Sequence, residues 1–283
     1  RKILGEKLID LPKKEIMYKS SPIEKKSIYG RGFTLWMLLE NILINRDIKL
    51  DKLNEYGFKN IIFGSIQRQS RLVKDINLKK LKEDGIKIYF IDGEDNSNVK
   101  LKYLPLGIYY KREIRSFSFF KKLDLIRMIN FSIPREKLQI DNCQKEKVFA
   151  KHVQCLEVYD IKDIRNHCSP NYSFDNEEDY YNDLSKSFYG ITMKKAGWDC
   201  MRHYEIAACG AVICFYKLSK KNKFCAPHGL VDMFNCITFN SSSELIKKIG
   251  YIKDNRIYNK IRNNSIKWII NNTCEKISKK ILY

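Results

Sequence analysis

The fold of this chain is decided by the stretch KKAGWDCMRHYEIAACGAVICF, residues 194–215. Gly197 interrupts its first part, and residues 201–209 then form one short helical run. Gly210 follows at the place where a helix C-terminus favours glycine. Residues 211–216 are apolar, as in a strand buried on both faces of a parallel sheet. The stretch therefore predicts a loop, a helix and a strand of an α/β fold.

The same stretch carries the features of an anion site. A helix N-terminus offers free N–H groups and partial positive charge. Lys194, Lys195 and Arg202 add full positive charges beside it. Glu205 comes three residues after Arg202, so both side chains share one helix face. A carboxylate next to a phosphate site is suited to accept hydrogen bonds from ribose hydroxyls, and we expect Glu205 in that role.

The pattern Arg202-x-x-Glu205-x-x-x-x-Gly210-x-Val212 resembles the donor-binding segment of GT-B glycosyltransferases. The wider strings DLSKSFYGITMKKAGWDCMRHYEIAACGAVICFY, residues 183–216, and NCITFNSSSELIKKI, residues 235–249, resemble a bacterial and viral, partly exostosin-like subgroup. The resemblance covers residues 179–250 well and the remainder in outline. The spaced glutamate pair of the commonest retaining families is absent, so the stereochemical outcome stays open.

The resemblance implies two Rossmann-like α/β domains facing a cleft. We expect an acceptor-side domain at residues 1–135 and a nucleotide-sugar-binding domain with terminal helices at 136–283. The implied activity is glycosyl transfer from a nucleotide diphosphate sugar, UDP-linked by expectation, to a hydroxyl of a glycan, a protein or another acceptor. Since enzymes of this fold generally work without a metal, we expect neither metal nor cofactor. Lys194, Lys195, Arg202 and the helix N-terminus would neutralise the departing diphosphate.

Helix and strand patterns alternate along the chain, which favours parallel sheets. In the first half we expect strands at 14–20, 60–64 and 86–92 and helices at 33–45 and 70–84. In the second half we expect strands at 148–152, 188–193, 211–216 and 236–239 and helices at 177–186, 201–209, 243–252 and 255–280. Ligands bind beyond the carboxyl ends of such strands.

Two loops of the first half follow predicted strands. Gly30, Arg31 and Gly32 precede the predicted helix at 33–45 and form a candidate acceptor or phosphate loop, although two glycines alone are a weak signal. Asp92, Glu94 and Asp95 place three carboxylates on one loop, and a base that deprotonates an acceptor hydroxyl needs such a group. The alternative is an acidic surface turn. We expect Asp95 to be the freest of the three.

Further donor contacts are predicted from single residues. Lys111 and Arg112 would help to neutralise the diphosphate, unless they form an internal ion pair with Glu113. Trp198 would stack on a base or sugar, or anchor the core. His203 and His228 would donate to the sugar or phosphate, or be structural.

Composition leaves rival functions open. The formal net charge of +20 makes weak binding to polyanions expected, and it suits a nucleic-acid-binding protein or a sugar transferase acting on modified DNA. The lysines are scattered, however, as in a chain encoded by an AT-rich genome. A non-catalytic sugar-nucleotide-binding relic is a third rival.

The cysteines and the apolar runs bear on location. All nine cysteines lie between Cys143 and Cys274 without a Cys-x-x-Cys pair. Several of them, such as Cys209, Cys214 and Cys236, suit buried positions, and a reducing cytosol fits best. Zinc ligation by His152 and Cys155, His167 and Cys168, or Cys225 and His228 is the alternative. No secretory signal and no run of eighteen apolar residues occurs, so we expect a cytoplasmic protein without a membrane span.

Overall fold

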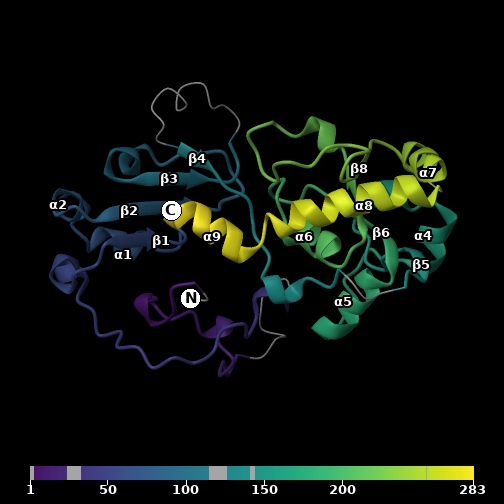
Figure 1. Ribbon diagram of the computed structural model, residues 1–283. Coiled ribbons are helices and arrows are strands. Elements are labelled where there is room, and N and C mark those ends of the chain that lie inside the picture. The colour runs from purple at the N-terminus through teal and green to yellow at the C-terminus, as the bar shows by residue number, and fades with distance from the viewer. Residues whose placement is uncertain (1–2, 24–32, 115–125, 141–143, 253) are drawn as a thin grey trace.

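Two parallel sheets of four strands each form the framework of the protein (Figure 1). The computed structural model describes residues 3–23, 33–114, 126–140, 144–252 and 254–283. The first sheet has the order β1 (Asn60–Phe63), β2 (Lys87–Asp92), β3 (Ile108–Lys111), β4 (Ile126–Met128). The second has the order β5 (Lys147–Phe149), β6 (Ser187–Met193), β7 (Val212–Tyr216), β8 (Ile237–Phe239). We call the parts around them the first and second half.

Helices cover the sheets of both halves. In the first half these are α1 (Ser70–Lys74) and α2 (Leu78–Glu83). In the second they are α4 (Lys162–His167), α5 (Glu177–Ser185), α6 (Met201–Ala208), α7 (Ser242–Tyr251) and α8 (Asn255–Ile270). The last helix, α9 (Cys274–Leu282), crosses back and lies over the first half (Figure 1).

Strand β7 is the centre of the second half. All five of its residues are buried, and they alternate between two hydrophobic clusters, one on each face of the sheet. Residues of α5 and α6 belong to one cluster, residues of α4 and α7 to the other, and α8 contributes to both. This confirms the prediction of a strand buried on both faces.

Glycines allow α6 to pack tightly against its neighbours. A Cβ atom at Gly190 on β6 would lie 2.6 Å from the Ile206 side chain on α6, so no larger residue fits there. Gly210 has a φ of +63°, the left-handed conformation expected of the residue that ends a helix. These two positions hold α6 at a fixed height over the sheet, with its first turn at the carboxyl ends of β6 and β7.

Four predicted elements of the chain differ in the structure. The strand expected at 14–20 is a short 3-10 helix, Glu15–Met17, followed by one isolated bridge from Tyr18 to Leu39. The helix expected at 33–45 is reduced to the 3-10 turn Phe33–Leu35, because Met37 adopts a φ of +50° that no α-helix accommodates.

The other two predicted helices are each divided. The helix expected at 70–84 breaks before Asn77, whose side chain accepts the Lys80 N–H and starts α2 afresh. The helix expected at 255–280 stops at Ile270, and the chain then forms a bridge from Thr273 to Ile133 before α9 begins. That bridge is where the chain returns to the first half.

Candidate functional site

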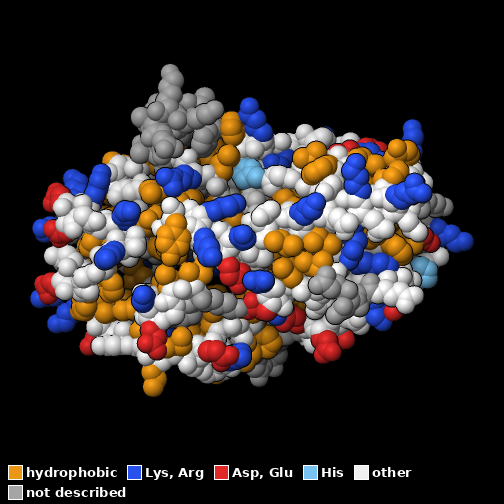
Figure 2. Space-filling model, in the orientation of Figure 1, with side chains coloured by type: hydrophobic (Ala, Val, Ile, Leu, Met, Phe, Trp, Pro, Cys, Tyr) orange, Lys and Arg blue, Asp and Glu red, His pale blue; other side chains and the backbone are white. Residues whose placement is uncertain are grey.

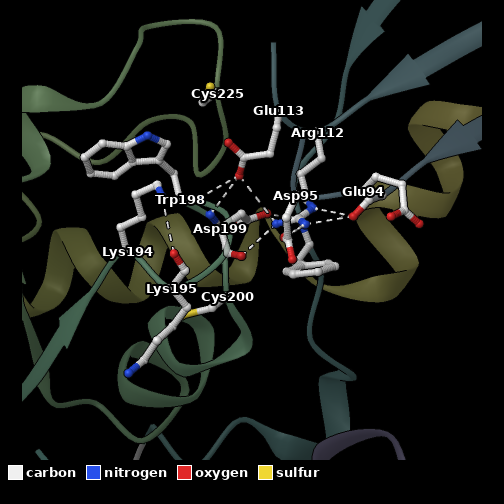
Figure 3. Close-up of polar contacts among 12 residues, drawn as sticks. Glu94, Asp95, Arg112, Glu113, Lys194, Lys195, Trp198, Asp199, Cys200 and Cys225 are labelled. Carbon is white, nitrogen blue, oxygen red and sulfur yellow. Dashed lines mark hydrogen bonds and ion pairs between the residues drawn. The ribbon is translucent and has the colours of Figure 1, made fainter. Parts of the chain in front are cut away.

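The two halves meet where the carboxyl ends of β2 and β3 face the loop of residues 194–200, which we call the cationic loop (Figure 3). Arg112, directly after β3, donates from Nη1 to the carbonyl of Asp199 at 2.7 Å. Its other guanidinium nitrogens donate to the Gly93 carbonyl at 2.7 and 3.1 Å and to the Asp95 carboxylate. Arg112 thereby ties the loop at 92–95 to the cationic loop.

Glu113 provides the second tie across this junction. Its Oε1 atom accepts the backbone N–H of Trp198 at 2.8 Å and that of Asp199 at 3.1 Å. Glu113 is buried, and its carboxylate also lies 3.5 Å from Arg112 Nη1. The internal ion pair between Arg112 and Glu113 that the sequence left open is therefore present. A desolvated carboxylate bound by two N–H groups fixes the backbone of the cationic loop firmly.

Gly197 is required by the closeness of this contact. A Cβ atom there would lie 2.6 Å from Asp95 Oδ1 and 2.8 Å from Glu113 Oε1. Any other residue would have to displace the acidic side chains that join the halves.

Inside the second half, Asp199 and His203 support the cationic loop. Asp199 accepts the N–H of Phe131 at 2.7 Å and the hydroxyl of Tyr204 at 2.8 Å, and burial raises its pKa. His203 Nε2 lies 2.9 Å from the Trp198 carbonyl, so it must carry the proton, and Nδ1 accepts from Thr192 at 3.0 Å. Burial lowers the pKa of His203 to about 4, which keeps it neutral.

Three cations border the free side of this loop. Lys194 and Lys195 are exposed, whereas Arg202, in the first turn of α6, is half-buried and donates to the His152 carbonyl at 2.9 Å. Partial desolvation, followed by the charge of Arg202, lowers the pKa of Lys195 although its side chain reaches solvent. Among the residues that the structure describes, none of the three has an ion-pair partner.

His152 lies beside these cations. Its side chain is buried, and neither ring nitrogen makes a hydrogen bond of good geometry within the described part of the chain. Burial, with the charges of Arg202 and Lys195, lowers the pKa of His152 to about 3. A neutral imidazole and unpaired cations at a helix N-terminus form an arrangement suited to an anionic oxygen-rich group.

Glu205 lies one turn further along α6. Its Oε2 atom accepts the Tyr180 hydroxyl at 2.6 Å, and Oε1 accepts the Thr34 hydroxyl from the first half. Among the residues that the structure describes, each carboxylate oxygen has one donor, which leaves a second lone pair for a ligand hydroxyl.

The three predicted carboxylates of the 92–95 loop have different surroundings. Asp92 is buried and accepts from Tyr109 at 2.5 Å and from Lys111 at 2.9 Å, so it holds β2 to β3. Asp95 is paired with Arg112. The Glu94 side chain has no ion pair or hydrogen bond within the described residues, and Figure 3 shows it across Arg112 from the cationic loop.

Several other residues predicted to contact the sugar-nucleotide donor are engaged with neighbouring protein groups instead. Lys111 is fully buried in its ion pair with Asp92, and the guanidinium of Arg112 is engaged in hydrogen bonds across the junction. Neither side chain therefore offers its charge to a diphosphate. His203 has both nitrogens engaged. The Trp198 ring packs 6.3 Å from Phe215, centroid to centroid, as a core anchor. Gly30, Arg31 and Gly32 lie outside the described residues.

Sequence reasoning missed the part played by Glu113 and His152. Glu113 meets its partners 85 and 86 residues later in the chain, and those partners are backbone groups, which leave no signature in a sequence. His152 was considered only as a zinc ligand. Within the described residues no group of three His, Cys, Asp or Glu side chains could hold a metal ion.

Structural comparison relates the fold of this chain to solved structures. A glycosyltransferase from Rickettsia africae superposes with a TM-score of 0.53 at 12% identity, covering 87% of this chain and 83% of that one. Anabaena HepE, solved with UDP and glucose, gives a TM-score of 0.49 at 10% identity over 87% of this chain and 85% of HepE. No protein-family model and no curated protein matches the sequence.

The Rickettsia likeness, together with the two parallel four-stranded sheets, shows the fold. The chain has the two-domain α/β architecture of GT-B glycosyltransferases, as predicted. No helix in the described ranges has the length and apolar character needed to cross a lipid bilayer.

Proposed function

We propose that the protein is a glycosyltransferase that moves a sugar from a nucleotide diphosphate donor to an acceptor hydroxyl. One observation carries the proposal: Lys195 and Arg202 are unpaired cations, within the described residues, at the N-terminus of α6 on this fold. The likeness of the fold to the glycosyltransferase from Rickettsia africae supports it.

In the proposed reaction, the acceptor oxygen bonds to the anomeric carbon while the bond from that carbon to the diphosphate breaks. The electron pair leaves with the diphosphate, where Lys194, Lys195, Arg202 and the free N–H groups of α6 offset the new negative charge. Glu205 accepts from the ribose hydroxyls. Because protein cations meet the diphosphate, we propose that no metal ion is required, and turnover should survive EDTA.

The acceptor proton goes to a base of the first half or the junction. Glu94 is our candidate, since Asp92 and Asp95 are already paired. His228 is the alternative: its Nε2 atom is buried without a partner in the described residues, and burial lowers its pKa to about 4. Turnover with Glu94→Gln and His228→Gln decides between them, because loss of a base lowers turnover by roughly a hundredfold while donor affinity stays near normal.

A thermal-shift screen across UDP-, GDP-, TDP- and CDP-sugars tests the function as a whole. We expect one nucleotide class to raise the melting temperature and to be turned over slowly by water. Stabilisation without any hydrolysis or transfer would favour the non-catalytic relic, and no stabilisation by any of the four would contradict the proposal.

The nucleic-acid alternative has weaker support in the structure. Figure 2 shows Lys and Arg side chains spread over the whole visible face, with acidic side chains among them. A nucleic-acid site instead gathers its basic residues on one face or groove. The net charge of +20 therefore predicts weak attraction to polyanions rather than a dedicated site.

A further inference from the structure

Glu205, the carboxylate assigned above to the ribose of the donor, is covered by a hydroxyl group of the first half. Thr34 donates its hydroxyl to Glu205 Oε1 and lies 3.0 Å, oxygen to oxygen, from the hydroxyl of Tyr181 on α5. Tyr180, also on α5, donates to Glu205 Oε2 at 2.6 Å. Of these three hydroxyl groups, that of Thr34 alone comes from the first half, in the turn Phe33–Leu35.

This contact leaves no room for a ribose at the carboxylate. Glu205 is 9% exposed and Thr34 is 3% exposed. Each oxygen of Glu205 has a lone pair left. A ribose that presents two neighbouring hydroxyl groups is nevertheless too large to reach both oxygens through so small an opening. It meets the carboxylate only after a group that covers the carboxylate has moved.

Thr34 is the group that can move. The two tyrosines lie on α5 and Glu205 on α6, two helices whose buried residues share one hydrophobic cluster. The turn Phe33–Leu35 instead precedes Met37, where the chain bends with a φ of +50°. Within the described residues, the backbone hydrogen bonds that join this segment to residues 16–19 begin at Met37. The turn can therefore withdraw without breaking them.

Thr34 also has the chemistry of the group to which it gives way. A threonine hydroxyl is a secondary alcohol, like the 2′ and 3′ hydroxyls of ribose, and each of them can donate one O–H to a carboxylate. We propose that Thr34 forms an autoinhibitory contact: its hydroxyl competes with the ribose of the donor for Glu205. The inference rests on the donor site proposed above. Donor binding in the second half then releases a turn of the first half, which couples the two halves.

Calorimetric titration of the full chain with UDP, GDP and CDP, each also in its 2′,3′-dideoxy form, tests the competition. Thr34→Val keeps the shape of the side chain and removes the hydroxyl. It should bind the preferred ribonucleotide about tenfold more tightly, because a charge-assisted hydrogen bond no longer has to be broken. The dideoxy form has no hydroxyl for Glu205, so its affinity should change by less than about threefold.

Three further variants complete the experiment. Thr34→Ser keeps a hydroxyl and should retain the affinity of the unaltered protein, whereas Thr34→Ala should show the same gain as Thr34→Val and replaces that variant if it fails to fold. Thr238→Val on β8 is the matched control, because the Thr238 hydroxyl makes no hydrogen bond within the described residues. It should leave the affinity unchanged.

Two kinds of failure are distinguishable. An unchanged or weaker affinity for the ribonucleotide without the Thr34 hydroxyl, or an equal gain for the dideoxy form, would overturn the competition and leave the donor site in place. Binding of no nucleotide by the unaltered protein or by any variant would instead contradict the donor site, and the competition with it.

Discussion

Glu113 Oε1 lies 2.8 Å from the backbone nitrogen of Trp198, so a carboxylate of the first half holds the loop that carries the cations of the second. Asp199 N–H reaches the same oxygen atom, and Arg112 binds the Asp199 carbonyl from the other side. The position of the cationic loop, which carries Lys194 and Lys195, therefore depends on the contact between the halves. In the proposed enzyme, the phosphate site is assembled only when the halves are joined.

Glu113→Ala should destabilise the protein by about 1–3 kcal/mol, because two buried N–H groups lose their acceptor. Urea unfolding followed by circular dichroism measures the change. Glu94→Ala is the matched control, since its side chain has no partner in the described residues, and it should shift stability by less than about 0.5 kcal/mol. Equal stability of the two variants would show that the tie contributes nothing.

Gly197→Ala should cost about 1–3 kcal/mol, because the new methyl group displaces Asp95 and Glu113 from their contacts. Gly93→Ala, on the facing loop, is the control: a Cβ atom there meets nothing within 4 Å. Melting temperatures of both variants give the comparison. If Gly197→Ala melts no lower than Gly93→Ala, the halves do not approach as closely as described.

Burial of neutral His203 should make the protein sensitive to acid. Its pKa is about 4 when folded and about 6.5 when unfolded, so the unfolded chain binds more protons between these values. Stability should therefore fall as the pH drops from 6.5 towards 4. Between pH 7 and pH 5 the loss from this group is about 1–2 kcal/mol.

His203→Gln is the matching variant, because glutamine can still accept from Thr192 and donate to the Trp198 carbonyl. Asp199, whose raised pKa acts in the opposite direction, and Arg202 face the same site in both proteins. The difference in urea unfolding between the two proteins at pH 7 and pH 5 therefore isolates the histidine. An identical pH dependence would contradict burial in the neutral form.

The second half could be predicted from sequence because its signals are local. Apolar runs such as residues 211–216, the glycine after α6 and the Ser241 cap, which accepts the Glu244 N–H, each act within a few residues. The N-terminal segment could not be predicted in this way. Residues 33–45 have helical spacing, yet the chain forms only the 3-10 turn Phe33–Leu35 before Met37 adopts a positive φ.

The candidate site shows the same contrast between local signals, which a sequence reveals, and long-range contacts, which it does not. The cations beside α6 could be predicted as a candidate site because they share one short stretch with a helix start. The ion pair between Lys111 and Asp92 could not be predicted from sequence, because it joins two strands and residues 19 positions apart. Charge alone does not distinguish a buried ion pair from a ligand contact.

Duplex DNA should bind weakly at low salt and be released by physiological salt, because scattered lysines neutralise phosphates without a fitted surface. Fluorescence anisotropy with two unrelated duplexes, each measured from low to physiological salt, gives the comparison. Tight binding of one sequence over the other at physiological salt would instead indicate a nucleic-acid-binding protein.

Calorimetric titration with UDP, GDP, TDP and CDP, repeated with the Arg202→Gln variant, tests the central claim most directly. One nucleoside diphosphate should bind the unaltered protein, and Arg202→Gln should weaken that binding by about 1.5–3 kcal/mol, or at least tenfold. Arg165→Gln on α4 is the control, because Arg165 likewise donates only to backbone carbonyls within the described residues and should not affect binding. Binding of none of the four, or unchanged affinity in Arg202→Gln, would contradict a donor site at the N-terminus of α6.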